Sequence, residues 1–117
     1  MKKTNVSADS NPKYDTNPVN ATTDKVFLLS INEANKYFGS VEDSKCIPTE
    51  YAKENGAYTS SSNTKNGVPT CMWWLRALGD YRAYAAFVNH DGSVNYFGNS
   101  VDNSNTCVRP TVWLNIK

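Results

Sequence analysis

Two hydrophobic blocks that carry tryptophan constrain the fold of this chain more than any other feature. The first is Cys71–Arg76, with the sequence Cys-Met-Trp-Trp-Leu-Arg, and the second is Val108–Leu114, with the sequence Val-Arg-Pro-Thr-Val-Trp-Leu. Aromatic and β-branched residues fill both blocks, and Gly or Pro residues accompany them, a pattern typical of strands in a protein core. The two blocks therefore predict core strands in the last third of the chain.

The stretch between the blocks, residues 77–108, has a composition of its own. It contains no Lys, Glu, Gln, Met or Trp and is rich in Asn, Tyr, Ser, Asp and Gly. That composition is close to an antibody combining site, where Tyr gives rigid contact area and Asn and Ser give adaptable hydrogen bonds. Loops also favour Asn, Ser and Gly. The stretch is therefore either a binding face displayed on a scaffold or a half-exposed, loop-rich β-region.

Length and charge exclude several classes of protein. A chain of 117 residues with a net charge of +1 is one domain at most, and its Lys and Arg residues form no basic patch. We therefore expect no nucleic-acid partner. No apolar run approaches the roughly 20 residues of a membrane-spanning helix, so we expect no direct membrane insertion. Residues 1–23 are nearly devoid of apolar side chains, which predicts a disordered or loosely attached tail before a domain at residues 24–117.

The cysteine and histidine content argues against a metal site. Cys46, Cys71 and Cys107 are odd in number, so at least one is free, and the sequence does not say whether any two are bridged. Their spacing resembles no zinc site, and the single histidine, His90, precedes an Asp-Gly turn signal. No paired carboxylates stand out either, so we expect no metal, no cofactor and no catalytic residues.

The first half of the predicted domain has a strand followed directly by a helix. Val26–Leu29 is a short apolar run typical of a buried strand. Ser30 with Glu33 three positions on forms a capping box, which predicts a helix over residues 31–38. A second, shorter helix is expected from Thr49 to Asn55, with its first residue as the N-cap.

The second half of the domain is predicted to be β-structure. A polar loop over residues 60–67 leads to a strand at Thr70–Leu75. Tyr84–Asn89 and Val94–Phe97 flank the Asp-Gly pair and predict a hairpin, and Val108–Ile116 predicts a final strand. The expected fold is α+β, with two short helices packed on a mostly antiparallel twisted sheet and long polar loops.

Alternation along the strands predicts which side chains form the core. In the first tryptophan block, Trp73 and Leu75 share one face, while Trp74 and Arg76 share the other, where Arg76 either stacks on the Trp74 ring or merely covers it. Arg109 is expected to bond a backbone carbonyl or an acidic neighbour, because an unpaired charge is costly to bury in an apolar strand. The residues expected to be largely buried are Trp73, Leu75, Val112, Leu114, Val26, Leu28 and Phe38.

Six segments together resemble a bacterial domain family of unknown function that often stands at the C-terminus of surface or secreted proteins. They are Lys25–Ser30, Pro48–Lys53, Gly56–Tyr58, Trp73–Arg76, Val88–Gly92 and Val108–Leu114. The resemblance covers residues 24–117 and implies a C-type-lectin-like fold of the formylglycine-generating-enzyme branch. It also implies an extracellular or cell-surface location within a larger protein, and the isolated domain is expected to be a monomer.

Some members of that family look like variable proteins of diversity-generating retroelements, whose reverse transcriptase randomises adenines in a template. Randomising the first two bases of AAC or AAT codons never gives Lys, Glu, Gln, Met or Trp, the five residue types missing from residues 77–108. The expected ligand-binding residues are Asp80, Tyr81, Arg82, Tyr84, Asn89, His90, Asn95, Tyr96, Asn99, Asn103 and Asn105. Among them, Tyr81, Tyr84 and Tyr96 are the expected anchors.

Three functions fit these observations. The first is a ligand-binding module of receptor or adhesion type that presents a Tyr/Asn/Ser-rich face to a protein or glycan on a surface. The second is a carbohydrate-binding domain of fixed specificity, and the third is a relative of the formylglycine-generating oxidases. The calcium-binding motifs of sugar-binding lectins are absent from the sequence, and the cysteine arrangement of the oxidases does not map onto Cys71 or Cys107. We therefore expect a binding module and not an enzyme.

Overall fold

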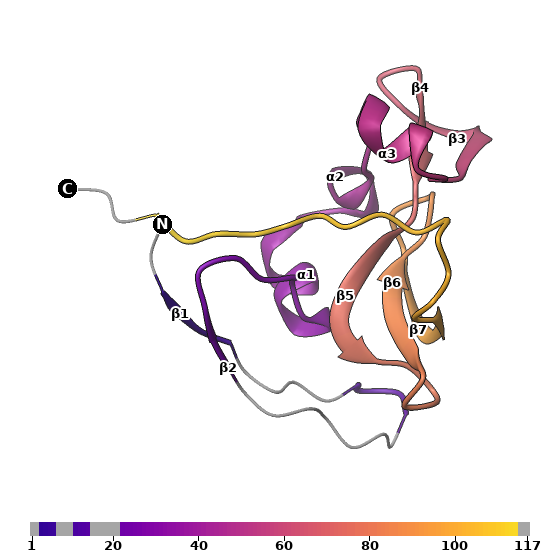
Figure 1. The fold of residues 1–117 in the computed structure, drawn as a ribbon. Helices are drawn as coiled ribbons and strands as arrows, with labels where there is room; N and C mark the ends of the chain where they lie inside the picture. The colour runs from indigo at the N-terminus through magenta and orange to yellow at the C-terminus, as the bar shows by residue number, and fades with distance from the viewer. Residues whose placement is uncertain (1–2, 7–10, 15–21, 115–117) are drawn as a thin grey trace.

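The computed structural model describes residues 3–6, 11–14 and 22–114. Within these ranges the chain forms short helices and antiparallel sheets, so the predicted α+β class is confirmed (Figure 1). The helices are α1 (Ile31–Tyr37), α2 (Val41–Ser44) and α3 (Glu50–Glu54). In the described part of the chain, no helix has the length and apolar character needed to span a membrane.

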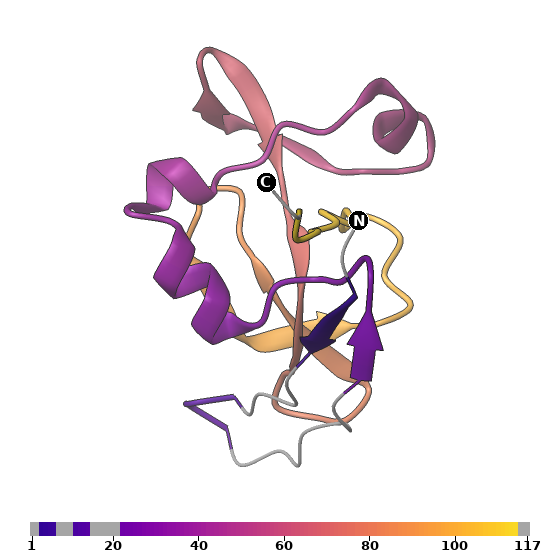
Figure 2. The same ribbon diagram turned by 90° about the vertical axis from the view of Figure 1, so that its left-hand side faces the viewer.

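The largest sheet has three antiparallel strands in the order β5–β6–β7. Its strands are β5 (Trp73–Leu78), β6 (Tyr84–Val88) and β7 (Val94–Ser100). Two further antiparallel pairs lie within the described residues: β1 (Thr4–Val6) with β2 (Thr22–Asp24), and β3 (Thr59–Lys65) with β4 (Val68–Cys71). Figure 2 shows α1 and α2 together on one side of β5, and the β3–β4 hairpin beyond one end of it.

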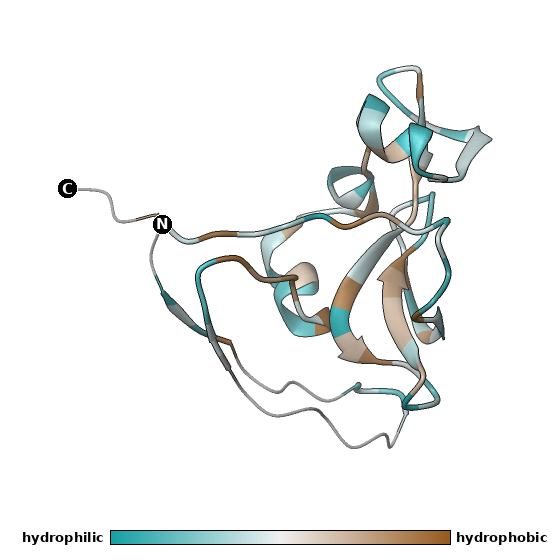
Figure 3. Cartoon of the chain, viewed as in Figure 1, coloured by the Kyte–Doolittle hydropathy of each residue, from teal (hydrophilic) through white to brown (hydrophobic). Residues whose placement is uncertain are grey.

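The core lies between the main sheet and α1. Burial alternates strictly along β5, so Trp73 and Leu75 are buried, as predicted, while Trp74 is half-buried. Ile31 and Ala34 of α1 pack into the same cluster. Figure 3 shows hydrophobic residues on β5 and β6 and on the extended segments that flank them, which is where this core is built.

The predicted helix starts are confirmed by their caps. At α1, the Glu33 N–H donates to Ser30 Oγ (3.1 Å) and the Ser30 N–H donates to Glu33 Oε1 (2.9 Å), which completes a capping box. At α3, the Ala52 N–H donates to Thr49 Oγ1 (3.1 Å). The short helix α2, capped by Ser40, was not predicted, so the expectation of two helices is wrong by one.

The segment predicted as a polar loop over residues 60–67 is instead most of a β-hairpin. Strand β3 consists of Ser, Thr and Asn residues followed by Lys65, and it pairs with β4 around the dipeptide Asn66-Gly67. Both turn residues have positive φ, +53° and +79°, as in the tight turns that Asn-Gly favours between antiparallel strands. Pairing with β4 therefore overrides the polar composition of this segment.

The extended segments at both ends of the predicted domain pair less than expected. Phe27 and Thr111 exchange two backbone hydrogen bonds (3.0 and 2.8 Å) in an isolated antiparallel bridge, but neither segment forms a longer strand within the described residues. With few neighbours on their outer faces, Val26 (49% exposed), Val112 and Leu114 (62%) are not buried, which corrects that prediction. Leu28 and Phe38 are half-buried, and residues 115 and 116 of the predicted final strand lie outside the described part.

Described residues of the predicted N-terminal tail contact the domain. Asn11 is buried, and its Nδ2 donates to the carbonyl oxygens of Leu78 (3.1 Å) and Tyr96 (2.7 Å). Val6 of β1 is also buried in the core cluster. The domain boundary at residue 24 stays a prediction.

Ser44 at the end of α2 joins three parts of the molecule. Its carbonyl oxygen accepts hydrogen bonds from Trp73 Nε1 (2.9 Å) and from the Arg109 guanidinium (3.3 Å). Its own hydroxyl shares its single proton between the carbonyl oxygens of Val41 and Gly92. The guanidinium of Arg109 also stacks on the Trp73 and Phe38 rings, 4.9 Å from each centroid. The prediction that Arg109 bonds a backbone carbonyl is confirmed.

The other arginine of the tryptophan blocks has a role that was not predicted. Arg76 donates to the carboxylate of Glu33 (2.9 Å) and to the Leu28 carbonyl, and it lies over the Phe27 ring. The Trp74 ring packs edge to face on Phe87 instead. Arg76 thus ties β5 to the capping box of α1.

We expect the Arg109→Ala protein to lose about 2 kcal/mol of unfolding free energy, because a stacked cation and a hydrogen bond to a carbonyl are both removed. Urea denaturation followed by tryptophan fluorescence measures this loss. An Arg109→Lys protein should recover only part of it, because a lysine ammonium cannot stack as a planar guanidinium does. An unchanged midpoint for Arg109→Ala would contradict the structural role.

Candidate functional site

The predicted ligand-binding residues are not gathered in one place. They divide among the β5–β6 turn end of the main sheet (Asp80, Tyr81, Arg82, Tyr84, Asn99), the β6–β7 turn end (Asn89, His90, Asn95), the middle of β7 (Tyr96) and the loop after β7 (Asn103, Asn105). All eleven are exposed or half-buried, and none lies in the core. The structure therefore brings together five of them, at the β5–β6 turn.

Four aromatic rings meet at that turn and form what we call the aromatic patch: Tyr14, Tyr81, Tyr84 and Phe97. Tyr81 and Tyr84 lie 5.1 Å apart, Tyr84 and Phe97 5.7 Å, and Tyr14 and Phe97 5.9 Å, all edge to face. Tyr81 is 59% exposed and Phe97 45%. Figure 1 shows the segment at residues 11–14 beside this turn, at the end of the sheet away from α3.

Sequence reasoning missed two members of the aromatic patch. Phe97 was assigned to the hairpin but not to the site. The next residue, Gly98, has a φ of +89°, which marks an irregular point in β7. Tyr14 lay in the predicted tail, and no local pattern placed it on the sheet. Asp80 and Arg82 flank the patch with opposite charges, and Arg82 is exposed.

The asparagines of the predicted site mainly shape the loops. Asn95 Oδ1 accepts the Gly98 N–H (3.0 Å), and Asn103 Oδ1 accepts the Asn105 N–H (2.8 Å). Likewise, Asn99 Oδ1 accepts the Ser100 N–H (2.9 Å). Local bonds of this kind are why loops favour asparagine, so turn formation accounts for part of the Asn-rich composition.

The β6–β7 turn is built on similar contacts. Asp91 Oδ1 accepts the N–H and the hydroxyl of Ser93, and these hydrogen bonds lower the pKa of Asp91. His90 Nε2 lies 3.2 Å from the Tyr58 carbonyl oxygen, and the two rings pack edge to face. Across the described residues, no three His, Cys, Asp or Glu side chains are grouped so that they could hold a metal ion.

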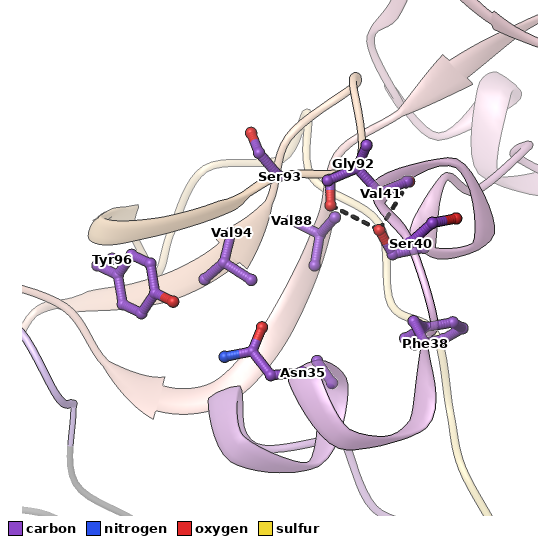
Figure 4. A pocket seen from close by; sticks show the side chains of 11 residues that line it. Asn35, Phe38, Ser40, Val41, Val88, Gly92, Ser93, Val94 and Tyr96 are labelled. Carbon is purple, nitrogen blue, oxygen red and sulfur yellow. Dashed lines mark hydrogen bonds between the residues drawn. The ribbon is translucent and has the colours of Figure 1, made fainter.

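A groove of about 370 Å³ lies between α1–α2 and the β6–β7 hairpin, and we call it the helix–hairpin groove. Figure 4 shows Asn35 and Phe38 on its helix side, and Val88, Val94 and Tyr96 on its strand side. Tyr96 is the only predicted site residue that lines it. The residues lining it are Ala34, Asn35, Phe38, Ser40, Val41, Ser44, Val88, Gly92, Ser93, Val94 and Tyr96.

The three cysteines converge in space, and none is bridged to another. Cys71 lies between the other two in the backbone pairing, because it forms an antiparallel bridge with Cys46 and the next residue, Met72, accepts the Cys107 N–H. The hydrogen bond from Cys71, helped by the charges of Arg109 and Lys65 against partial burial, lowers the pKa of Cys46 to about 6. Hydrogen bonding to Cys107 and Cys46, together with burial, raises the pKa of Cys71 far above its usual range.

A family model for a domain of unknown function, DUF6273, matches residues 1–116 of the chain. This chain belongs to the DUF6273 family. The match extends over almost the whole sequence, including the N-terminal residues that contact the aromatic patch and the main sheet. No curated protein and no solved structure matches the chain.

Proposed function

We propose that this DUF6273 domain is a ligand-binding module of receptor or adhesion type and that the aromatic patch is its contact surface. The observation that carries the proposal is the exposure of clustered rings: Tyr81 and Phe97 are each about half exposed within one connected cluster. Tyrosine gives a large contact area at low entropic cost, so such clusters are frequent at the centres of protein interfaces. Asp80 and Arg82 supply polar contacts at the edge.

The arrangement of the rings favours a protein ligand over a glycan. Neighbouring rings in the patch meet at interplanar angles of 81°, 82° and 63°. Several coplanar faces would be needed to stack a flat sugar chain, whereas edge-to-face rings make a ridged surface. An irregular protein surface can fill the hollows between such rings, as complementary interfaces do.

We further propose that the scaffold is C-type-lectin-like. The segment at residues 26–29 runs directly into α1, and the C-terminal segment returns to pair with it antiparallel at Phe27 and Thr111. In the sequence, the antiparallel strands β5, β6 and β7 come between these two segments, and they carry the loops of the proposed site. Such a scaffold holds its loops at one place while their sequence varies, which suits a variable receptor. Such a receptor would stand at a cell surface as part of a larger protein.

The helix–hairpin groove favours a second candidate, a carbohydrate-binding domain of fixed specificity. Its volume lies within the range of small-ligand sites, and its lining combines apolar side chains with hydroxyl and amide groups. Tyr96 and Phe38 offer rings, while Asn35 and Ser93 offer polar groups. One sugar unit at a chain end fits this description better than a protein surface does.

We expect the Tyr81→Ala protein to bind its ligand about thirtyfold more weakly, which is the loss of about 2 kcal/mol that an interface anchor gives. The measurement is a screen against bacterial surface proteins and glycans, followed by titration of each hit, with and without a chelator. Affinity should survive the chelator, because the proposed contacts need no metal ion.

The matched control is Tyr51→Ala, which removes a tyrosine that is 75% exposed on α3, outside the patch. Its binding should equal that of the unchanged protein. Asn35→Trp, which fills the helix–hairpin groove from an exposed helix position, tests the second candidate. If binding is lost in Asn35→Trp and kept in Tyr81→Ala, the ligand binds in the helix–hairpin groove and not on the aromatic patch.

The coding DNA tests whether the face is diversified. A diversified face predicts AAC and AAT codons concentrated in the stretch that encodes residues 77–108. A near-copy of that stretch and a reverse-transcriptase gene should lie nearby. If AAC and AAT codons are instead distributed evenly along the gene, the face is not diversified and the receptor has a fixed specificity.

A further inference from the structure

The three cysteines come from separate parts of the chain and meet at the junction of two sheets. Cys46 lies in the link between α2 and α3, Cys71 ends β4, and Cys107 follows the long loop after β7. Cys46 and Cys71 form an antiparallel bridge in which the Cys71 N–H donates to the Cys46 carbonyl oxygen (2.9 Å). Cys107 is joined to the residue after Cys71, because its N–H donates to the Met72 carbonyl oxygen (2.9 Å).

The three thiols differ in how solvent reaches them. Cys71 is fully buried and Cys107 is buried, whereas Cys46 is partly exposed, and its Sγ lies 3.8 Å from the Ile47 carbonyl oxygen at the surface. A reagent in solution therefore meets the sulfur of Cys46 before that of Cys71.

Four charged or titratable groups from other segments act on the Cys46 thiol. They are the thiols of Cys71 and Cys107 and the cationic side chains of Arg109 and Lys65. The Cys71 hydrogen bond and the two cations favour the thiolate form of Cys46, and the thiolate is the nucleophile in disulfide chemistry.

We propose that Cys46 is a thiol–disulfide exchange site for small disulfides such as oxidised glutathione or cystine, and that Cys71 resolves the adduct into a Cys46–Cys71 disulfide. This inference does not rest on the proposed ligand-binding function. It assigns distinct roles to the three cysteines: Cys46 attacks, Cys71 resolves, and Cys107 stays a buried thiol.

The exchange balances in two steps. The Cys46 thiolate attacks one sulfur of the small disulfide, forms a mixed disulfide and releases the first small thiolate. Cys71 then attacks Cys46 Sγ and passes its proton to the departing small thiolate, which leaves as the second small thiol. The two protein thiols are oxidised, and the small disulfide is reduced to two thiols.

The first step prepares the second. The thiolate charge of Cys46 and the hydrogen bond to it are among the causes that keep Cys71 protonated. Formation of the mixed disulfide removes that negative charge, so deprotonation of Cys71 becomes easier when its sulfur must attack.

Backbone geometry favours Cys46 over Cys107 as the partner of Cys71. Directly opposed residues of antiparallel strands have Cα atoms about 4.5–5.5 Å apart, inside the 4.4–6.8 Å range of disulfides. Cys107, in contrast, is paired with Trp73 in a parallel bridge and is therefore offset from Cys71 along the chain. The Cys46–Cys71 bridge would join the α2–α3 link to β4 without a large backbone shift.

The test uses the full chain, reduced and then incubated with oxidised glutathione near neutral pH. Intact-mass and peptide mapping should find the Cys46–Cys71 disulfide, with a Tm about 10 °C higher than that of the reduced protein. Cys71→Ser should accumulate a stable glutathione adduct on Cys46, Cys46→Ser should not react, and the control Cys107→Ser should still form the bridge.

The pH dependence separates an activated thiol from an ordinary one. The rate of adduct formation in Cys71→Ala, which lacks the hydrogen-bonding thiol, should fall at neutral pH relative to the unchanged protein. In the unchanged protein the rate should be nearly constant from neutral pH upward and decline below a pH of about 6. A rate that keeps rising to about pH 8.5, as for a free cysteine, or mapping of a Cys71–Cys107 disulfide would overturn the proposal.

Discussion

Replacing Gly92 by alanine is expected to destabilise the protein by about 3–5 kcal/mol, the sum of backbone strain and a steric clash. A Cβ atom at this position would lie 1.8 Å from the Val41 carbonyl oxygen and 2.7 Å from its carbon, and both atoms belong to the backbone of α2. The φ of Gly92 is +89°, in a region that residues with side chains rarely adopt. Relief of the clash would move α2 and break the Ser44 hydrogen bond to the Gly92 carbonyl.

The matched control is Gly67→Ala in the β3–β4 turn. Gly67 has a similar φ of +79°, but a Cβ there would meet no atom within 4 Å. Its substitution therefore isolates the backbone strain, which should cost about 1 kcal/mol. Chemical denaturation of both variants measures the difference. Equal losses would mean that the close approach of Gly92 to α2 contributes nothing.

The second large effect is expected for Trp73→Ala. Trp73 is fully buried, packs edge to face on Phe38, lies under the Arg109 guanidinium and donates to the Ser44 carbonyl. Removing a buried tryptophan costs about 3–5 kcal/mol, which is a large share of the stability of a small domain. We expect a much lower Tm than that of the unchanged protein, as measured by circular dichroism on heating.

Two comparison variants divide this effect into parts. Trp73→Phe keeps a ring in the core but removes the Nε1 donor, so it should cost less than the alanine change. Trp113→Ala removes a ring that packs on Tyr37 at the surface, and it should cost about 1 kcal/mol. A similar loss for Trp113→Ala and Trp73→Ala would contradict the placement of Trp73 in the core.

The features predicted well from the sequence are those that neighbours in the chain decide. The capping box of Ser30 and Glu33 and the Asp-Gly turn of the β6–β7 hairpin depend on a few adjacent residues. The alternation that buries Trp73 and Leu75 is likewise local. Asn66-Gly67 is an equally strong local turn signal, but residues 60–67 were predicted to be a loop from their polar composition alone.

The features that were missed depend on contacts between distant segments. The burial of Val112 and Leu114 was predicted from hydrophobicity, but burial also requires a neighbouring element that covers these side chains, and both stay exposed beside the bridge between Thr111 and Phe27. Nothing near Tyr14 in the sequence indicates that its ring meets Phe97. The convergence of the cysteines follows from pairing among the α2–α3 link, β4 and the C-terminal segment, which no spacing pattern reveals.

The hydrogen bonds of Asn11 have a consequence for the order of folding. Its amide joins carbonyl oxygens of β5 and β7, partners that lie 67 and 85 positions away in the chain. Closing loops of that length costs entropy before any contact is gained, so long-range contacts form late. The two acceptors also exist at this spacing only once the main sheet has assembled. The N-terminal segment is therefore the last part to dock and the first to detach in a partial opening of the molecule.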